Sequence, residues 1–313
     1  MPRLALLSIV LLLPARATAQ APGLHLAARQ PVAVLPMDYD GHIFVTATVN
    51  GLPARLLLDP VAGLMLDRQY AQARPGWYHD WRELGMQGPT MVGGGGGAEV
   101  EVTWADSVRL QLGSFERFFP RTVVIPLDSM MGDAIHGQPD GLFGTGLLRD
   151  YAVHLDFANS RLELFDPATV DTTGWQVLPL TFLGARATTT VEITIADTIH
   201  HTLRTQVDLG MAPAFRVTTR ETNARHLLRH AGGRRTSGRG LGGNLLSVQL
   251  GDVTIRLGEL TAGPMEISLA REPRGADADP PYDALMGLGL LSQFDVIYDP
   301  SNARLLVRER KLP

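Results

Sequence analysis

The sequence predicts a mostly β protein built from two similar halves. The first observation is composition, because 33 glycines and 21 prolines in 313 residues, with few apolar patterns of helical period, favour turns and short strands. The second is that a long segment of the chain occurs twice. The third is that an aspartate ends a predicted strand in each half. Together they predict two duplicated β units.

The repeated segment covers residues 140–164 and 283–307. The first copy reads DGLFGTGLLRDYAVHLDFANSRLEL and the second reads DALMGLGLLSQFDVIYDPSNARLLV, and they align without a gap. Each contains two apolar residues followed by glycine, Leu142–Gly144 in one copy and Leu285–Gly287 in the other. Two copies of so long a pattern indicate a duplication that gives two lobes, since a solenoid would need more repeats.

Each half also begins with a predicted hairpin that ends in aspartate. Residues 43–59 alternate between apolar and polar around an Asn-Gly turn, and the second strand ends at Asp59. Residues 191–208 alternate in the same way and end at Asp208. One aspartate at a strand end is commonly a turn residue. Two at equivalent positions of a duplicated unit predict a shared role instead.

The stretches between these landmarks are less regular. In the second half, residues 219–230 have a helical pattern, and the glycine- and arginine-rich residues 231–243 predict a solvated loop. The spacing of His226 and His230 suits a metal site, but no third ligand is apparent, so we expect a solvated helix face.

The N-terminus predicts an exported protein. Arg3, the apolar run Leu4–Leu13 and the small residues of Ala17–Ala19 have the order of a signal peptide over residues 1–19. The mature chain would begin at Gln20 and reach the periplasm or the medium. We divide the remainder into an N-terminal lobe, residues 20–178, and a C-terminal lobe, residues 179–313.

The charge balance excludes some classes of partner. The formal net charge of −4 gives no basic field for nucleic acid or an anionic membrane. No apolar run is long enough for a membrane span, and the chain has no cysteine for disulfides.

With these features the chain resembles the pepsin-like, two-lobed aspartic protease family over essentially its whole mature length. The resemblance implies a mostly β, bilobal acid-protease fold of two β-barrel-like lobes with a central cleft. It implies that Asp59 and Asp208 are the catalytic pair. The glycines of the apolar-glycine strands, Gly144 and Gly287, would support the cleft. A flap over the substrate would come from residues 85–104.

The aspartate turns depart from the family pattern of Asp-Thr/Ser-Gly. Pro60 and Leu209 replace the hydroxyl residue, and only Gly210 keeps the glycine. Pro60 has no N–H to donate, and Val61 disfavours the positive φ that a glycine adopts. We also assign Pro60, Leu209 and Gly210 to the support of the cleft.

The resemblance implies hydrolysis of peptide bonds by a water activated between two aspartates, with no metal or cofactor. The alternative is a non-catalytic pseudoprotease that binds a peptide or a partner protein in the same cleft. The substrate would be a peptide or protein. A monomer would suffice for the site, because both lobes belong to one chain.

Overall fold

The computed structural model describes residues 30–310 except 75, 94–98, 133–134, 136 and 276–277. Strands dominate this part of the chain and the helices are short, so the predicted mostly β class is confirmed. The predicted signal peptide lies outside the described residues.

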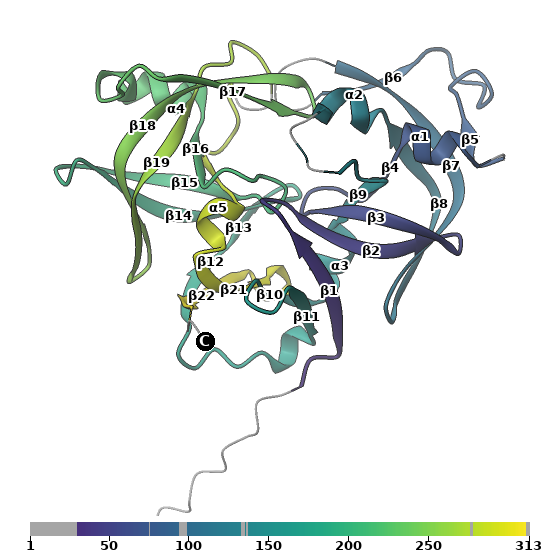
Figure 1. Cartoon of the computed structure of the whole chain (residues 1–313), viewed down its shortest axis with the longest axis horizontal. Coiled ribbons are helices and arrows are strands. Elements are labelled where there is room, and N and C mark those ends of the chain that lie inside the picture. The colour runs from purple at the N-terminus through teal and green to yellow at the C-terminus, as the bar shows by residue number, and fades with distance from the viewer. Residues whose placement is uncertain are drawn as a thin grey trace, which may run out of the picture.

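The strands form two sheets (Figure 1). The 14-stranded sheet takes these strands from the first half of the chain: β1 (Ala33–Tyr39), β2 (Ile43–Val49), β3 (Leu52–Asp59), β4 (Leu64–Asp67), β5 (Tyr78–His79), β6 (Thr90–Gly93), β7 (Glu99–Leu112), β8 (Phe115–Ile125), β9 (Gly141–Gly144), β10 (Ala152–Asp156) and β11 (Arg161–Phe165). It is completed by β12 (Gln176–Pro179), β21 (Phe294–Asp299) and β22 (Arg304–Glu309).

The 8-stranded sheet belongs to the second half of the chain. Its strands are β13 (Thr181–Leu183), β14 (Arg186–Ile195), β15 (Ile199–Val207), β16 (Phe215–Val217), β17 (Arg235–Gly240), β18 (Gly243–Leu257), β19 (Leu260–Ala270) and β20 (Ala284–Met286). The helices are α1 (Arg68–Gln72), α2 (Leu127–Met131), α3 (Thr145–Asp150), α4 (Thr219–Ala224) and α5 (Leu288–Leu291). Short 3₁₀ turns cover Pro167–Thr169, Leu227–Arg229 and Pro300–Asn302.

The two halves contain the same closed ring of strands. The first ring has the order β2-β3-β9-β4-β8-β7 and closes by pairing β2 with β7. The second has the order β14-β15-β20-β16-β19-β18 and closes by pairing β14 with β18. In both, the strand that leads to the aspartate runs parallel to the apolar-glycine strand, β3 with β9 and β15 with β20. The sequence repeat therefore corresponds to a repeated strand order.

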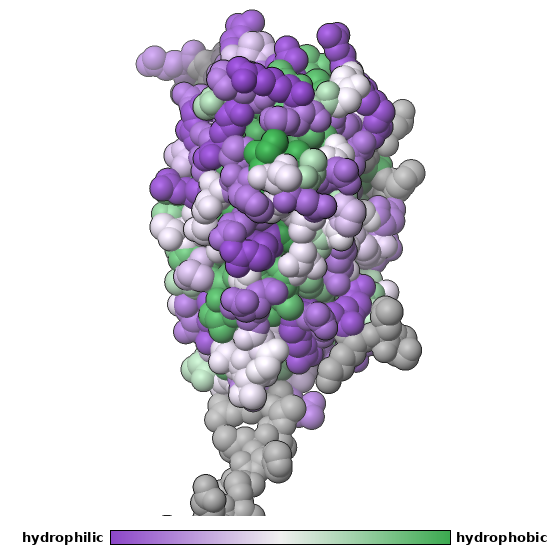
Figure 2. Space-filling view, turned by 90° about the vertical axis from the view of Figure 1, so that its left-hand side faces the viewer, coloured by the Kyte–Doolittle hydropathy of each residue, from purple (hydrophilic) through white to green (hydrophobic). Residues whose placement is uncertain are grey.

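A block of strands joins the two rings. Its strand order is β12-β22-β21-β10-β11-β1. The order is symmetric about its centre, because β12, β22 and β21 of the second half are equivalent to β1, β11 and β10 of the first. Its centre is the antiparallel pair β10–β21, in which Leu155 lies opposite Val296. In Figure 1 this block lies between the rings and below them. The face seen from the left of Figure 1 is mainly hydrophilic, with small apolar areas between polar side chains (Figure 2).

The predicted hairpins are present. Asn50 and Gly51 both have positive φ, 49° and 80°, which is the turn geometry that suits a two-residue hairpin. Ala196 and Asp197 turn the second hairpin with φ of 45° and 57°. Because both turns are tight, they fix the register of the strands that lead to the aspartates.

Alternation along β3 determines which way Asp59 faces. Leu56 and Leu58 lie in the large core that runs through both rings, whereas Leu57 lies in a separate apolar cluster. Since side chains two residues apart share a face of a strand, the side chain of Asp59 lies on the same face of β3 as that of Leu57.

Two sequence expectations in the second half were wrong. The helix expected over residues 219–230 ends at Ala224, and His226 has a left-handed φ of 55°, so His226 and His230 do not share a helix face. The expected loop at residues 231–243 contains β17, which pairs with β18. Its glycines and arginines are compatible with a strand because the ladder with β18 satisfies the backbone.

Candidate active site

The carboxylates of Asp59 and Asp208 converge beside Gly210. A Cβ placed on Gly210 would lie 3.1 Å from Asp59 Oδ2 and 3.3 Å from Asp208 Oδ1. Asp59 ends β3 and Asp208 directly follows β15, so equivalent strands deliver one carboxylate each. The pair expected from the sequence is thus brought together in space.

Backbone N–H groups hold the Asp59 carboxylate in place. Val61 N–H donates to Asp59 Oδ1 at 2.8 Å, and Ala62 N–H donates to the same oxygen at 3.2 Å. The donor that Pro60 lacks is therefore not needed at this carboxylate. Val61 is not among the described residues with positive φ, so the glycine conformation expected there is not required. Pro60 itself is buried.

The Asp208 turn repeats this arrangement. Gly210 N–H donates to Asp208 Oδ1 at 2.9 Å, as Val61 N–H does for Asp59. The N–H of Asp208 donates to Met286 O at 2.9 Å and continues the β15–β20 ladder. Leu209 is completely buried in the large core. The two residues that replace the family's hydroxyl residue are thus apolar and buried.

Thr145 supports the first turn, a role that the sequence analysis missed. Its hydroxyl donates to Pro60 O at 3.0 Å, and its N–H donates to Ala62 O at 2.8 Å. The second half keeps only the backbone bond, from Leu288 N–H to Met211 O at 2.8 Å. The available signal was position, because Thr145 directly follows the glycine of the repeated motif.

The two motif glycines allow the apolar-glycine strands to pass directly against the aspartate turns. A Cβ on Gly144 would lie 2.1 Å from Asp59 O, and one on Gly287 would lie 2.2 Å from Pro213 O. Both distances are far shorter than a van der Waals contact, and the backbone oxygens cannot move aside. These positions therefore exclude every side chain.

The second pair of equivalent aspartates, Asp140 and Asp283, has a structural role. Asp140 Oδ2 accepts the N–H of Arg55 at 2.8 Å, and Asp283 Oδ2 accepts the N–H of Arg204 at 2.8 Å. Each fixes the start of an apolar-glycine strand against the strand that leads to the catalytic candidate.

Electrostatics distinguish Asp59 from an exposed carboxyl group. Burial raises the pKa of Asp59, and the N–H groups of Val61 and Ala62 and the charge of Arg186 oppose that rise. Burial also raises the pKa of the Tyr298 phenol, with a further contribution from the charge of Asp208. Burial therefore opposes ionisation of Asp59.

Two hairpins each contribute a residue to the apolar cluster that contains Leu57, Val102 from one and Leu241 from the other. The expected flap includes the β6–β7 hairpin, in which Thr90 lies opposite Val102, while residues 94–98 lie outside the described part. The β17–β18 hairpin reaches from the second ring to α2 of the first (Figure 1). Arg239 Nη1 donates to Ser129 O at 3.2 Å, within α2.

The cluster that contains Leu57 flanks Asp59, and we call it the apolar cluster. Its buried members are Phe44, Leu57, Ala62, Val102, Ile125, Leu127, Met130, Ile135 and Leu142. Leu241, from the tip of the β17–β18 hairpin, packs against it from the other ring. The apolar cluster therefore lies where the two rings meet.

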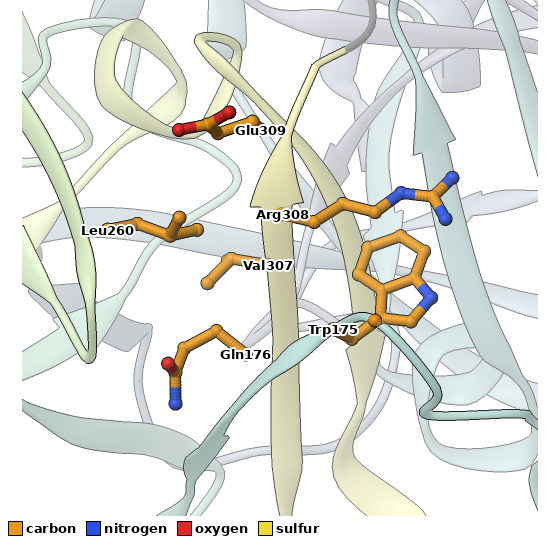
Figure 3. Close-up of a pocket in the computed structure, with 7 residues that line it drawn as sticks. Trp175, Gln176, Leu260, Val307, Arg308 and Glu309 are labelled. Atoms are coloured by element: carbon orange, nitrogen blue, oxygen red, sulfur yellow. The ribbon is translucent and has the colours of Figure 1, made fainter.

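A hollow of about 400 Å³ lies elsewhere, on the β12 and β22 side of the joining block. Trp175, Gln176, Leu260, Val307, Arg308 and Glu309 surround it (Figure 3). Arg308 stacks 4.1 Å from the centre of the Trp175 ring. The hollow contains neither Asp59 nor Asp208, and we assign no chemistry to it.

The described residues contain no candidate metal site. Among them, no group of three or more His, Asp or Glu side chains is arranged to hold a metal ion. Nor does the described part contain a helix with the length and apolar character needed to cross a membrane.

A scan against models of known protein families finds no match, and a search of curated proteins finds no similar sequence. The function therefore has to be argued from the geometry of the two aspartates.

Proposed function

We propose that the chain is an aspartic-type endopeptidase with a pepsin-like fold, in which Asp59 and Asp208 activate a water between two lobes. The observation that carries this proposal is the convergence of their carboxylates, each delivered by an equivalent strand of a duplicated ring. The repeated strand order supports the two lobes.

In the proposal, the two carboxylates, which both lie beside Gly210, are too close to ionise together. Such a pair shares one proton, as the two aspartates of aspartic proteases do, and titrates as a unit. In the proposal, Asp59 holds the proton because burial raises its pKa. Asp208 takes a proton from water, the water attacks the amide carbonyl, and Asp59 polarises that carbonyl. The proton on Asp208 then passes to the leaving amine.

The N–H bonds to both carboxylates support a working site. Val61 N–H holds one oxygen of Asp59, and Gly210 N–H holds one oxygen of Asp208, so both carboxylates are fixed in orientation by the backbone. This compensates for the hydroxyl groups that Pro60 and Leu209 do not provide. A site that was loose by about 1 Å would lose about two orders of magnitude in rate.

A pseudoprotease is the second candidate, and the burial of Pro60 and Leu209 favours it. With apolar side chains after both aspartates, no side-chain hydroxyl at these positions can link the two turns. The same residues would then bind a peptide without cleaving it.

The deciding experiment measures cleavage of an unfolded protein between pH 3 and pH 7. Wild type is compared with Asp59→Asn, Asp208→Asn and the control Asp171→Asn, an exposed turn aspartate. Activity in wild type and the control, lost in the other two variants, supports the peptidase. A folded wild type without activity at any pH supports the pseudoprotease.

A further inference from the structure

Equivalent strands of the two rings differ in the polarity of the side chains on the face beside the aspartates. In the first ring, a row of residues that pair with one another across neighbouring strands begins on β3 and is apolar throughout. It consists of Leu57, Leu142, Met65, Val123 and Trp104. Following the same route from β15, the second ring presents Gln206, Leu285, Arg216, Ser268 and Gln249. Four of five positions thus change from apolar to polar.

Both rows start next to a catalytic candidate. Leu57 lies two residues before Asp59, and Gln206 lies two residues before Asp208. Because side chains two residues apart share a face of a strand, each row flanks its own carboxylate. A substrate centred on the two aspartates would extend one neighbouring side chain toward each row.

The change from apolar to polar extends beyond the two rows. Ser247 and Val102 are equivalent, because each lies two residues before the last member of its row. Glu272 and Leu127 are equivalent, because each lies four residues after the fourth member of its row. We call the resulting group the polar cluster, which consists of Gln206, Arg216, Ser247, Gln249, Ser268 and Glu272. The apolar cluster beside Asp59 therefore has a polar counterpart beside Asp208.

An ion pair organises the polar cluster. Arg216 Nη2 donates to Glu272 Oε1 at 2.5 Å, and Arg216 Nη1 donates to Ser247 Oγ at 2.5 Å. Leu246 N–H also donates to Glu272 Oε1. Arg216 is only 5% exposed and Glu272 only 2%. The pair is therefore buried and held by several hydrogen bonds.

Two acceptor atoms of the cluster remain unsatisfied. Gln206 Oε1 and Glu272 Oε2 are buried and have no hydrogen-bond partner among the described residues. Gln206 is 3% exposed. Buried acceptors without donors are costly and are usually satisfied by something. A ligand that donates hydrogen bonds would satisfy them.

We propose that the polar cluster is a specificity subsite for an amide side chain, Asn or Gln, next to the cleaved bond of the substrate. An amide NH₂ group supplies hydrogen-bond donors to such acceptors and brings no charge of its own into the cluster. A lysine side chain would instead bring a second positive charge next to Arg216. The apolar cluster would take a large apolar side chain on the other side of the bond. This inference rests on the proposed function for the location of the substrate.

The test separates binding from cleavage. Binding is measured with Asp59→Asn, which needs no catalysis, using peptides of one length whose two central residues are Leu-Gln, Gln-Leu, Leu-Met, Met-Leu or Leu-Lys. We expect one Gln peptide to bind about tenfold tighter than the Met peptide of the same order. Equal binding of Gln and Met peptides in both orders, tighter binding of the Met peptides or of the Lys peptide, or no binding, overturns the subsite.

Variants copied from the first ring locate the effect. In the Asp59→Asn background, Gln206→Met keeps the size of the side chain and the ion pair, and it should abolish the preference for Gln. The combination of Arg216→Met with Glu272→Leu, which copies Met65 and Leu127, should reverse it toward Met. Thermal unfolding shows which variants fold, and Gln206→Met alone suffices if the combination does not. A preference that survives Gln206→Met contradicts the proposal.

The two proposals can fail independently. If wild type cleaves peptides but shows no Gln preference, the peptidase stands and the subsite is wrong. If wild type cleaves nothing while Asp59→Asn prefers Gln peptides, the subsite stands as a binding site and the catalytic proposal is wrong.

Discussion

Gly210 lies directly against Asp59, although the two residues belong to different rings. A Cβ on Gly210 would be 3.1 Å from Asp59 Oδ2, closer than nine in ten real Cβ contacts. The N–H of Gly210 meanwhile holds Asp208. One residue therefore positions one carboxylate and limits the approach of the other.

We expect Gly210→Ala to lower kcat/KM about tenfold while the protein stays folded. The new methyl group must move the carboxylates by a few tenths of an ångström, and catalysis is sensitive to such shifts. Gly63→Ala is the matched control, because a Cβ on Gly63 meets nothing within 4 Å. Peptide hydrolysis and thermal unfolding of both variants check the prediction. Equal activity of the two variants would contradict it.

Asp59→Asn should stabilise the protein at pH 7. Because burial raises the pKa of Asp59, the folded state holds this proton more tightly than the unfolded chain. Stability then falls as pH rises from the ordinary value of 3.8 through the raised pKa. Asparagine does not ionise, so the variant avoids this loss of stability. Its side-chain oxygen can still accept hydrogen bonds from the N–H groups of Val61 and Ala62. We expect Tm at pH 7 to rise by about 2 °C or more and Tm at pH 3 to change little.

Asp171→Asn is the opposite case and serves as the control. The Thr173 N–H lowers the pKa of the exposed Asp171, so its charged form contributes stability above the ordinary pKa. Its replacement should not raise Tm at pH 7. An equal rise in both variants would show that lower net charge, and not the burial of Asp59, is the cause.

The sequence was informative where a pattern occurred twice. The repeat at 140–164 and 283–307 and the hairpins before Asp59 and Asp208 predicted the mostly β class and the elements that deliver both carboxylates. The convergence of these carboxylates needs the packing of both rings, which no local pattern encodes.

Other features depend on partners distant in the sequence. The composition of residues 231–243 is typical of a loop, and only the pairing with β18 makes β17 a strand. Arg216 and Glu272, which form the buried ion pair, are 56 residues apart in the sequence. Their relation becomes visible only when the registers of the two rings are compared.

Thr145→Val should weaken the first aspartate turn. It removes the hydroxyl that donates to Pro60 O but keeps the shape of the side chain. We expect a loss of about 1 kcal/mol in the free energy of unfolding and a lower kcat with KM little changed. Denaturant unfolding and peptide kinetics check both. Thr145→Ser keeps the hydroxyl and should retain most of the activity; if it behaves like Val, the methyl group is what matters.

Arg239→Gln should loosen the β17–β18 hairpin from α2. The guanidinium donates to Ser129 O, while Leu241 packs on the apolar cluster nearby, so the hairpin tip is held at two points across the rings. Removing one of them should raise hydrogen exchange of the β17 amides and leave that of the β14–β15 hairpin unchanged. Arg235, at the other end of β17 and exposed, provides the control Arg235→Gln. Faster exchange in both variants would mean that the strand, and not its contact with α2, had been weakened.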